Sequence, residues 1–588
     1  MKKSALWLVA MLLVLSMFLA ACNGGGDEVA KKDEKDTTEQ TDTSTDDKEE
    51  PASDEPVSGG VVTYAYSQPF KGLLEMGLYQ GEDDSIALGF MMESLIGTGD
   101  DLLPEENIAT WEFSDDYTQL TFKLQSGVKW HDGHELTAED MEYAWYVLAD
   151  KDYTGPRYSN VSMIKGAEAY KKGEATTIEG IEVIDDYTIR VTVTEPVVNL
   201  LDNIWVTPMP KHYYEGIPVV ELENSDKVRK NPIGLGPFKV KNIVPGEMIE
   251  FERFDDYWKG KPYLDGVVYK IVDATLATGL LENGEIDIMG APASQYQEIK
   301  ALDNLLLHEE PSLGYSYIGF DMGHYDAEAG KIVMDNPKFQ NKALRHAMAH
   351  ALDRQGILDA FSNGLGQVIN VPFPSVSWAK IPDDQIKGYE FDPEKAKQLL
   401  DEAGYKDIDG DGFREDPDGN QLTINFDAMS GSDISEPRAQ FILQSWQEVG
   451  LNAQLNGGAL KEFNLFYDTI QADDPSVETF MGAWGLASDP DPTGLWTSSD
   501  AWNFPRWYTD KSDELIKKGI SFPEDTSKDV IEHRKEVYYE WQKIVNEELP
   551  MIFLSQPLDV YAVNKRVQGT DANAFTVQKD VHLWWIKQ

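Results

Sequence analysis

The sequence predicts a mixed α/β fold that is divided among several domains. Short stretches of alternating apolar and polar residues, typical of strands, are interspersed with amphipathic segments that begin at helix-capping residues. The 588 residues suffice for about two to four domains at about 100–200 residues each. The 41% hydrophobic and 11% aromatic content is enough for sizeable cores, and it excludes collagen, a pure coiled coil and global disorder.

The first elements of the body follow from local patterns. Residues 120–124 alternate between apolar and polar side chains and predict a strand. Residues 137–149 predict a helix, because the first four have the spacing of a capping box. Two further strands are expected at 178–184 and 188–194, joined by a turn.

The second half of the body favours longer helices. Residues 341–361 predict one long helix. A second helix is expected from Pro393 to about residue 404, since Asp392 is a good N-cap, proline suits the first helical position and a glycine closes the segment. Residues 422–429 read as a strand.

The N-terminus has the features of an export signal. Lys2 and Lys3 precede an apolar run over 4–19, and small residues then lead to Cys22. The sequence Leu-Ala-Ala-Cys resembles a bacterial lipobox, which implies a signal peptide over 1–21 and a lipidated Cys22. The alternative is an uncleaved signal anchor, although the apolar run is shorter than the roughly 20 residues of a membrane span.

A low-complexity acidic segment follows the lipobox. Residues 27–56 contain 13 acidic residues and four lysines and no aromatic residue. Such a stretch cannot bury enough apolar surface to fold, so 22–58 is interpreted as a lipidated, disordered linker. The formal charge of −52 for the whole chain excludes a nucleic-acid binder that neutralises phosphates, and the single cysteine excludes a disulfide-stapled fold.

The sequence contains no recognised catalytic motif. The GxSxG, phosphate-loop, HExxH and dinucleotide-binding patterns are absent. His346 and His350 have the spacing of two metal ligands on one helical face, but no glutamate follows His346 and apolar residues flank both, which favours a structural role. His131 and His134 lie in an expected loop and are interpreted in the same way. No enzymatic activity is therefore predicted.

One segment has the spacing of a calcium-binding loop. Oxygen-bearing side chains occupy positions 1, 3, 5 and 9, glycine stands at position 6, and position 12 carries aspartate instead of glutamate. The alternative is an Asp/Gly turn without a metal. If calcium binds, it is structural and is the one cofactor expected, and its candidate ligands are Asp407, Asp409, Asp411, Phe413, Glu415 and Asp418.

A second segment combines acidic and aromatic residues. Trp484, Asp489, Asp491 and Trp502 fall in a stretch rich in proline and glycine. Aromatic rings in such a loop are suited to line a cleft, and a carboxylate beside them suits a ligand ammonium. The alternative is that the tryptophans are core residues and the Asp-Pro pairs form turns.

Five blocks of sequence, in the same order, resemble the extracellular solute-binding proteins of peptide ABC importers. The resemblance covers about residues 60–588. It rests on segments 120–140, 231–238, 257–265, 284–287 and 351–354. The resemblance implies the two-lobed periplasmic-binding-protein type of α/β fold, with an extra domain inserted in the first lobe. The implied divisions are lobe I at 59–102, 232–310 and 555–588, the insertion at 103–231, and lobe II at 311–554.

The resemblance also implies a ligand site between the lobes. In relatives an aspartate in the segment that matches 484–492 binds the peptide's α-ammonium, which here indicates Asp489 and then Asp491. This chain lacks the Asp-Tyr-x-x-Pro pattern of one better-known subset. Other cleft residues implied, each equally compatible with a structural role, are Tyr64, Tyr66, Phe70, Ser430 and Gly431.

The function implied is that of a lipid-anchored receptor on the extracellular face of a bacterial, Gram-positive cytoplasmic membrane. The receptor would bind oligopeptides as a monomer and deliver them to an ABC transporter permease. The alternatives are a receptor of the same fold for another solute, such as an oligosaccharide or a metal chelate, and an anchored peptide hydrolase or foldase.

Overall fold

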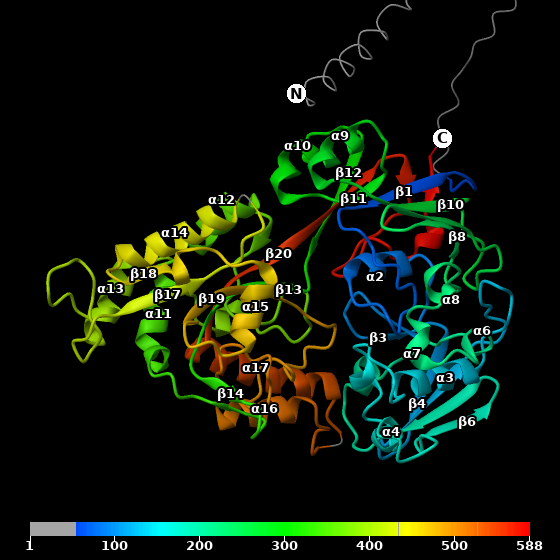
Figure 1. Cartoon of the computed structure of the whole chain (residues 1–588), viewed down its shortest axis with the longest axis horizontal. Coiled ribbons are helices and arrows are strands. Elements are labelled where there is room, and N and C mark those ends of the chain that lie inside the picture. The colour runs from blue at the N-terminus through cyan, green and yellow to red at the C-terminus, as the bar shows by residue number, and fades with distance from the viewer. Residues whose placement is uncertain (1–54, 433, 526, 588) are drawn as a thin grey trace, which may run out of the picture. The chain divides into compact units, whose positions relative to one another are not determined.

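The computed structural model describes residues 55–432, 434–525 and 527–587 (Figure 1). The predicted signal peptide (1–21), Cys22 and most of the predicted linker (22–58) lie outside the described residues. In the described part of the chain, no helix combines the length and the apolar character needed to cross a membrane.

The principal sheet contains 12 strands and extends through both lobes. Its order is β18-β17-β19-β13-β20-β11-β1-β10-β9-β8, and β12 and β16 also pair with β20. The strands are β1 (Val61–Tyr66), β8 (Phe238–Val244), β9 (Met248–Arg253), β10 (Gly266–Ile271), β11 (Ile288–Gly290), β12 (Leu305–Pro311), β13 (Gly314–Phe320), β16 (Gly366–Gln367), β17 (Thr423–Asp427), β18 (Asn452–Leu455), β19 (Thr479–Gly485) and β20 (Met551–Asn564).

Strand β20 belongs to both lobes. Its first residues pair antiparallel with β13 in lobe II, as in Ile318 with Ile552. Its last residues pair with β12 and β11 in lobe I, as in Ile288 with Val563. Figure 1 shows β20 extending from β13 and β19 to β11 and β12. The lobes are therefore joined by two extended segments, β12–β13 and β20.

The buried side chain of Gln556 links these two connections. Its amide nitrogen donates to the Ser312 carbonyl oxygen at 2.9 Å, and its amide oxygen accepts from the Ser375 backbone nitrogen at 2.9 Å. A buried amide needs such partners to offset its desolvation. The crossover between the lobes is thus held by side-chain as well as strand hydrogen bonds.

Lobe I packs short helices against β1 and β8–β11. Buried aromatic and aliphatic residues such as Phe90, Phe251 and Trp584 form its core. Lobe I also contains the small strands β21 (Val567–Gln568) and β22 (Trp585–Ile586) and the helices α2 (Glu82–Leu88), α9 (Ala277–Glu282) and α10 (Tyr296–Lys300).

The insertion has its own four-stranded antiparallel sheet and its own core. The order β4-β5-β7-β6 places the predicted strands together. The core also includes Leu73, Leu78 and Leu95, which belong to the segment that precedes the insertion. The strands are β4 (Ala109–Phe113), β5 (Gln119–Leu124), β6 (Ile181–Asp185) and β7 (Thr188–Thr192), with β2 (Ile96–Thr98) and β3 (Pro104–Glu106) beside them.

The expected helix after Thr137 forms as α3 (Ala138–Leu148). The Thr137 backbone nitrogen donates to the Asp140 carboxylate at 3.0 Å, which is the capping-box contact. The sequence prediction for this helix is therefore confirmed. Shorter helices complete the insertion, namely α4 (Ala167–Lys171), α5 (Leu200–Asn203), α6 (Lys211–Tyr214), α7 (Val219–Leu222) and α8 (Asp226–Arg229).

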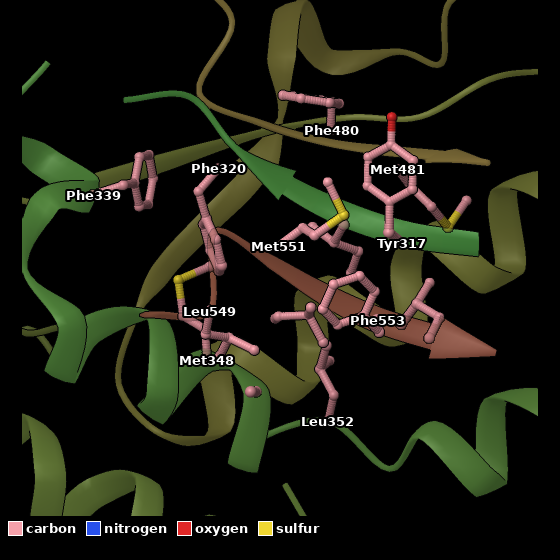
Figure 2. Packing of buried hydrophobic residues seen from close by; sticks show 14 of the residues in the cluster. Tyr317, Phe320, Phe339, Met348, Leu352, Phe480, Met481, Leu549, Met551 and Phe553 are labelled. Atoms are coloured by element: carbon pink, nitrogen blue, oxygen red, sulfur yellow. The ribbon is translucent and has the colours of Figure 1, made fainter. Parts of the chain in front are cut away.

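Lobe II has the largest core, between its strands and helices (Figure 2). Side chains from β13, β19 and β20 meet those of α11 there. Figure 2 shows Tyr317, Phe320, Phe480, Met481, Met551 and Phe553 from the strands with Met348 and Leu352. Its helices are α11 (Lys342–His350), α12 (Arg354–Ser362), α13 (Pro393–Glu402), α14 (Ser435–Glu448), α15 (Phe463–Gln471), α16 (Asp510–Gly519) and α17 (Val530–Glu548), and its separate hairpin is β14 (His324–Asp326) with β15 (Lys331–Val333).

Two predictions for lobe II have different outcomes. The helix expected from Pro393 is confirmed, and the Asp392 side chain caps it by accepting from the Lys395 backbone nitrogen at 2.9 Å. The single helix expected over 341–361 is wrong. The chain forms α11 and α12, because the Asp353 carboxylate accepts from the Gly356 backbone nitrogen at 2.8 Å and starts a new helix.

Candidate functional site

A cavity of about 880 Å³ lies where lobe I meets the crossover strand. Its wall includes β1, α2 and residues 557–561 of β20, and lobe II contributes Ser362 and Leu365. Its volume lies within the roughly 300–1,000 Å³ range of ligand sites. The cavity is therefore the main candidate for a binding site.

Tyr64 and Tyr66 line this cavity together with Tyr561. Tyr64 and Tyr66 both lie within β1, and residues two apart in a strand face the same side. The Tyr66 hydroxyl donates to the Glu82 carboxylate at 3.1 Å. Burial raises the pKa of Tyr66, and the negative charge of Glu82 raises it further. The tyrosines are accordingly neutral hydrogen-bonding groups.

Three carboxylates share the wall of the cavity, those of Glu82, Glu93 and Asp559. The Glu93 carboxylate accepts hydrogen bonds from the Asn107 amide, at 2.8 Å, and from the Tyr257 hydroxyl. Burial raises the pKa of Asp559; a hydrogen bond from the Ser312 side chain opposes the rise, and the charge of Glu82 adds to it. Among the described residues that line the cavity, none is basic. The cavity is therefore an acidic, aromatic site.

Asp489 and Asp491 line a smaller cavity of about 170 Å³ in lobe II. Both oxygens of Asp489 accept from Arg534, at 2.6 and 2.7 Å, and the two side chains are only 7% and 3% exposed. The Asp491 carboxylate accepts from the Thr493 backbone nitrogen at 3.0 Å. Arg534 already neutralises Asp489, so this ion pair would have to open before Asp489 could bind a ligand ammonium. Binding of the ammonium by Asp489 stays a prediction.

The same aspartates are contacted by the insertion. The Asn199 amide donates to Asp489 at 3.0 Å and to Asp491 at 3.3 Å. Burial, and then the charge of Asp489, raises the pKa of the neighbouring Asp202 to about 7. The Val198 backbone nitrogen also donates to the carbonyl oxygen of residue 520, at 3.1 Å. The segment selected from the sequence as a ligand site is thus where the insertion touches lobe II.

Trp484 and Trp502 belong to an aromatic cluster on lobe II. The Trp484 ring stacks on Phe504 with centroids 5.2 Å apart and lies 6.0 Å from the ring of Trp502. Trp502 is 52% exposed. Neither tryptophan is among the residues that line the two cavities above, so their predicted contact with ligand stays a prediction.

The other three predicted cleft residues have structural surroundings. Phe70 is buried in the core of lobe I, with its ring centroid 6.0 Å from that of Tyr269. The Ser430 hydroxyl and backbone nitrogen both donate to the Lys461 carbonyl oxygen, at 3.2 and 2.8 Å. Gly431 is exposed and has a φ of 132°, which favours glycine. None of the three lines the large cavity.

The predicted calcium loop brings together three of its acidic side chains. Carboxylate oxygens of Asp407, Asp409 and Glu415 lie within 4.8 Å of one another, and this group contains neither Asp411 nor Asp418 of the described loop. The position-6 glycine, residue 412, donates its backbone N–H to Asp407 at 3.0 Å. The loop's own hydrogen bonds thus hold part of a candidate cation site, and calcium binding stays a prediction.

The histidines occupy well-satisfied positions. His131 is buried, bonds the backbone of residues 234 and 236, and has its pKa lowered to about 4 by burial. His134 and His212 approach Asp132, but their rings stack at 4.1 Å with planes only 23° apart. A metal must lie near the plane of each imidazole that binds it, so nearly parallel stacked rings do not suit a shared ion.

The sequence reasoning missed the acidic residues of the large cavity. Glu82 and Asp559 come from opposite ends of the chain, so no local motif connects them. One signal was available, because Asp559 is the one charged residue of β20 and stands among apolar residues at 557–563. A carboxylate among the apolar residues of a strand is uncommon unless it has a partner.

Comparison with known proteins identifies relatives of the whole body. The model of the bacterial extracellular solute-binding proteins, family 5 (middle part), matches residues 105–505. The oligopeptide-binding protein AppA of Bacillus subtilis (strain 168) is 28% identical over 592 residues, which cover 100% of this chain and 99% of AppA.

Two solved structures share the fold. The structure of AppA with a nonapeptide has a TM-score of 0.69 and 26% identity, and covers 91% of this chain and 100% of its own. Lactococcal OppA, complexed with an endogenous peptide in the closed conformation, has a TM-score of 0.74 and 27% identity, with 89% and 99% covered. The predicted two-lobed α/β fold is thereby confirmed.

Proposed function

Because the chain belongs to the bacterial extracellular solute-binding proteins of family 5, we propose that it is a receptor for oligopeptides. The observation that carries this proposal is the cavity of about 880 Å³ beside β20, the strand shared by both lobes. The relatives that support an oligopeptide ligand are AppA, with its nonapeptide, and lactococcal OppA, with its endogenous peptide.

The proposed mechanism is closure of the lobes around an extended peptide. The two connections between the lobes, β12–β13 and β20, would act as the hinge. A ligand that contacts both lobes makes its full set of contacts in the closed state and shifts the population toward that state. Backbone hydrogen bonds to an extended peptide depend on its length and direction and tolerate many sequences.

The finer parts of the proposal concern location and delivery. Lipidation at Cys22 would retain the receptor on the extracellular face of the membrane, and the acidic linker would hold the lobes away from the bilayer. The closed receptor would then deliver its peptide to an ABC transporter permease. We propose no catalytic activity, because the sequence lacks a nucleophile–base motif and the matched family consists of binding proteins.

A titration of the purified body tests the proposal directly. We expect a mixed-length peptide library to quench or shift tryptophan fluorescence, because closure changes the surroundings of rings such as Trp502. Haemin and a mixed oligosaccharide preparation serve as controls for the other ligand classes. A response to haemin or sugars with none to peptides would contradict an oligopeptide ligand.

A further inference from the structure

The charge on the wall of the large cavity indicates which peptides it selects. On the basis of the proposed function, we infer that this site prefers peptides that place a lysine or arginine side chain against Glu82 and Asp559. The inference concerns the ligand class of the cavity and goes beyond the binding of oligopeptides in general. It rests on two independent features, the carboxylates and the aromatic rings that share the wall.

The carboxylates of Glu82 and Asp559 have little to neutralise them within the cavity. Glu82 accepts from the Tyr66 hydroxyl, which is neutral. Asp559 is partly buried, accepts a hydrogen bond from the neutral side chain of Ser312, and is repelled by the negative charge of Glu82. The described lining residues include no lysine, arginine or histidine. A cation brought into this space would relieve the repulsion between the two carboxylates.

The tyrosines provide the second feature. The rings of Tyr64, Tyr66 and Tyr561 belong to the same wall, and burial, followed by the charges of Asp559 and Glu82, raises the pKa of Tyr561 to about 12. Ring faces attract ammonium and guanidinium groups, more strongly where water is excluded. Carboxylates combined with neutral aromatic rings form a site suited to a basic side chain.

The α-ammonium of the peptide does not balance the negative charge of Glu82 and Asp559. Every free peptide carries one α-ammonium and one α-carboxylate, so a peptide with uncharged side chains brings no net positive charge. Glu82 and Asp559 together carry two negative charges when ionised. A basic side chain adds a positive charge that attracts these two carboxylates, whereas an acidic side chain is repelled by them.

The test compares what the protein selects from a random-sequence peptide library of mixed length. Bound peptides are separated from the input, released and sequenced by mass spectrometry. We expect Lys and Arg to be enriched about tenfold over Asp and Glu, which corresponds to about 1.4 kcal/mol. High salt should reduce the enrichment, because Glu82 is exposed to solvent ions.

The variants locate the effect. The double variant Glu82→Gln with Asp559→Asn should bring the enrichment close to onefold while thermal unfolding shows that it is folded. Glu174→Gln is the matched control, because Glu174 is exposed and does not line the cavity, and it should leave the enrichment unchanged. Enrichment that persists in the double variant would overturn the assignment to these carboxylates.

The remaining outcomes separate this inference from the proposed function. Equal recovery of basic and acidic peptides would overturn the charge preference and leave peptide binding intact. Recovery of no peptide would contradict the proposed function and, with it, the selection. A library with acetylated N-termini should give the same enrichment, because every free peptide carries the α-ammonium and this group alone cannot favour basic over acidic side chains. Loss of enrichment with that library would overturn the inference that the basic side chain is recognised by itself.

Discussion

The ion pair between Asp489 and Arg534 makes the sharpest prediction about lobe II. Asp489→Asn preserves the shape of the side chain and removes the charge that pairs with the buried guanidinium. Two hydrogen bonds between charged partners, at 2.6 and 2.7 Å, are replaced by bonds from the charged guanidinium to a single neutral amide oxygen. Loss of one partner of a buried pair costs about 3–5 kcal/mol. Because asparagine retains one acceptor, we expect a loss of about 3 kcal/mol in the free energy of unfolding.

Urea unfolding, followed by tryptophan fluorescence, measures this loss. Glu182→Gln is the matched control, because its pair with Arg190 is exposed, at 62% and 35%, and exposed pairs contribute about 1 kcal/mol or less. If Asp489→Asn unfolds like the unmodified protein but no longer binds peptides, the structural reasoning is refuted. Asp489 would then be the ligand-binding carboxylate that the sequence first suggested.

Three further predictions concern other parts of the chain. Glu75 is buried, and burial raises its pKa from 4.5 to about 7. The folded state therefore binds more protons than the unfolded state between these values, so stability falls as pH rises from about 4.5 to about 7, by about 3 kcal/mol. When urea unfolding is measured across this pH range, the Glu75→Gln variant should lack this decrease in the free energy of unfolding. Calcium at millimolar concentration should raise the melting temperature, and the double variant Asp407→Asn with Asp409→Asn should abolish the rise. Cys22→Ser should release the protein from the membrane fraction into the medium.

Each of these three has an outcome that would contradict it. An unchanged slope of stability against pH in Glu75→Gln would show that this carboxyl is not the group responsible. Equal melting temperatures with calcium and with chelator would leave 407–418 as an Asp/Gly turn. Membrane retention of Cys22→Ser would favour the signal-anchor alternative for the N-terminus.

Elements with a local cause could be predicted from the sequence. The helix after Thr137 follows from a capping box, and the helix after Asp392 follows from an N-cap with proline at the first position. Both depend on residues within one turn of one another. The break between α11 and α12 also has a local cause, which is the cap at Asp353. The apolar pattern continues across this break, and it therefore predicted one helix in place of two.

The binding site could not be predicted in the same way, because its parts are distant in the sequence. Tyr66 and Glu82 come from the beginning of lobe I, and Asp559 comes from the last long strand. Similarly, nothing near Asp489 indicates that Arg534 of α17 would neutralise it, or that Asn199 of the insertion would reach it. Only the tertiary structure brings these charges together.

The measurement that tests the central claim most directly is native mass spectrometry of the mature body. The protein would be purified from rich medium and then denatured, and the released ligands would be identified. The account predicts a heterogeneous set of peptides, bound one to each protein molecule and rich in lysine and arginine. Release of a sugar, a haem or a metal chelate in place of peptides would contradict it.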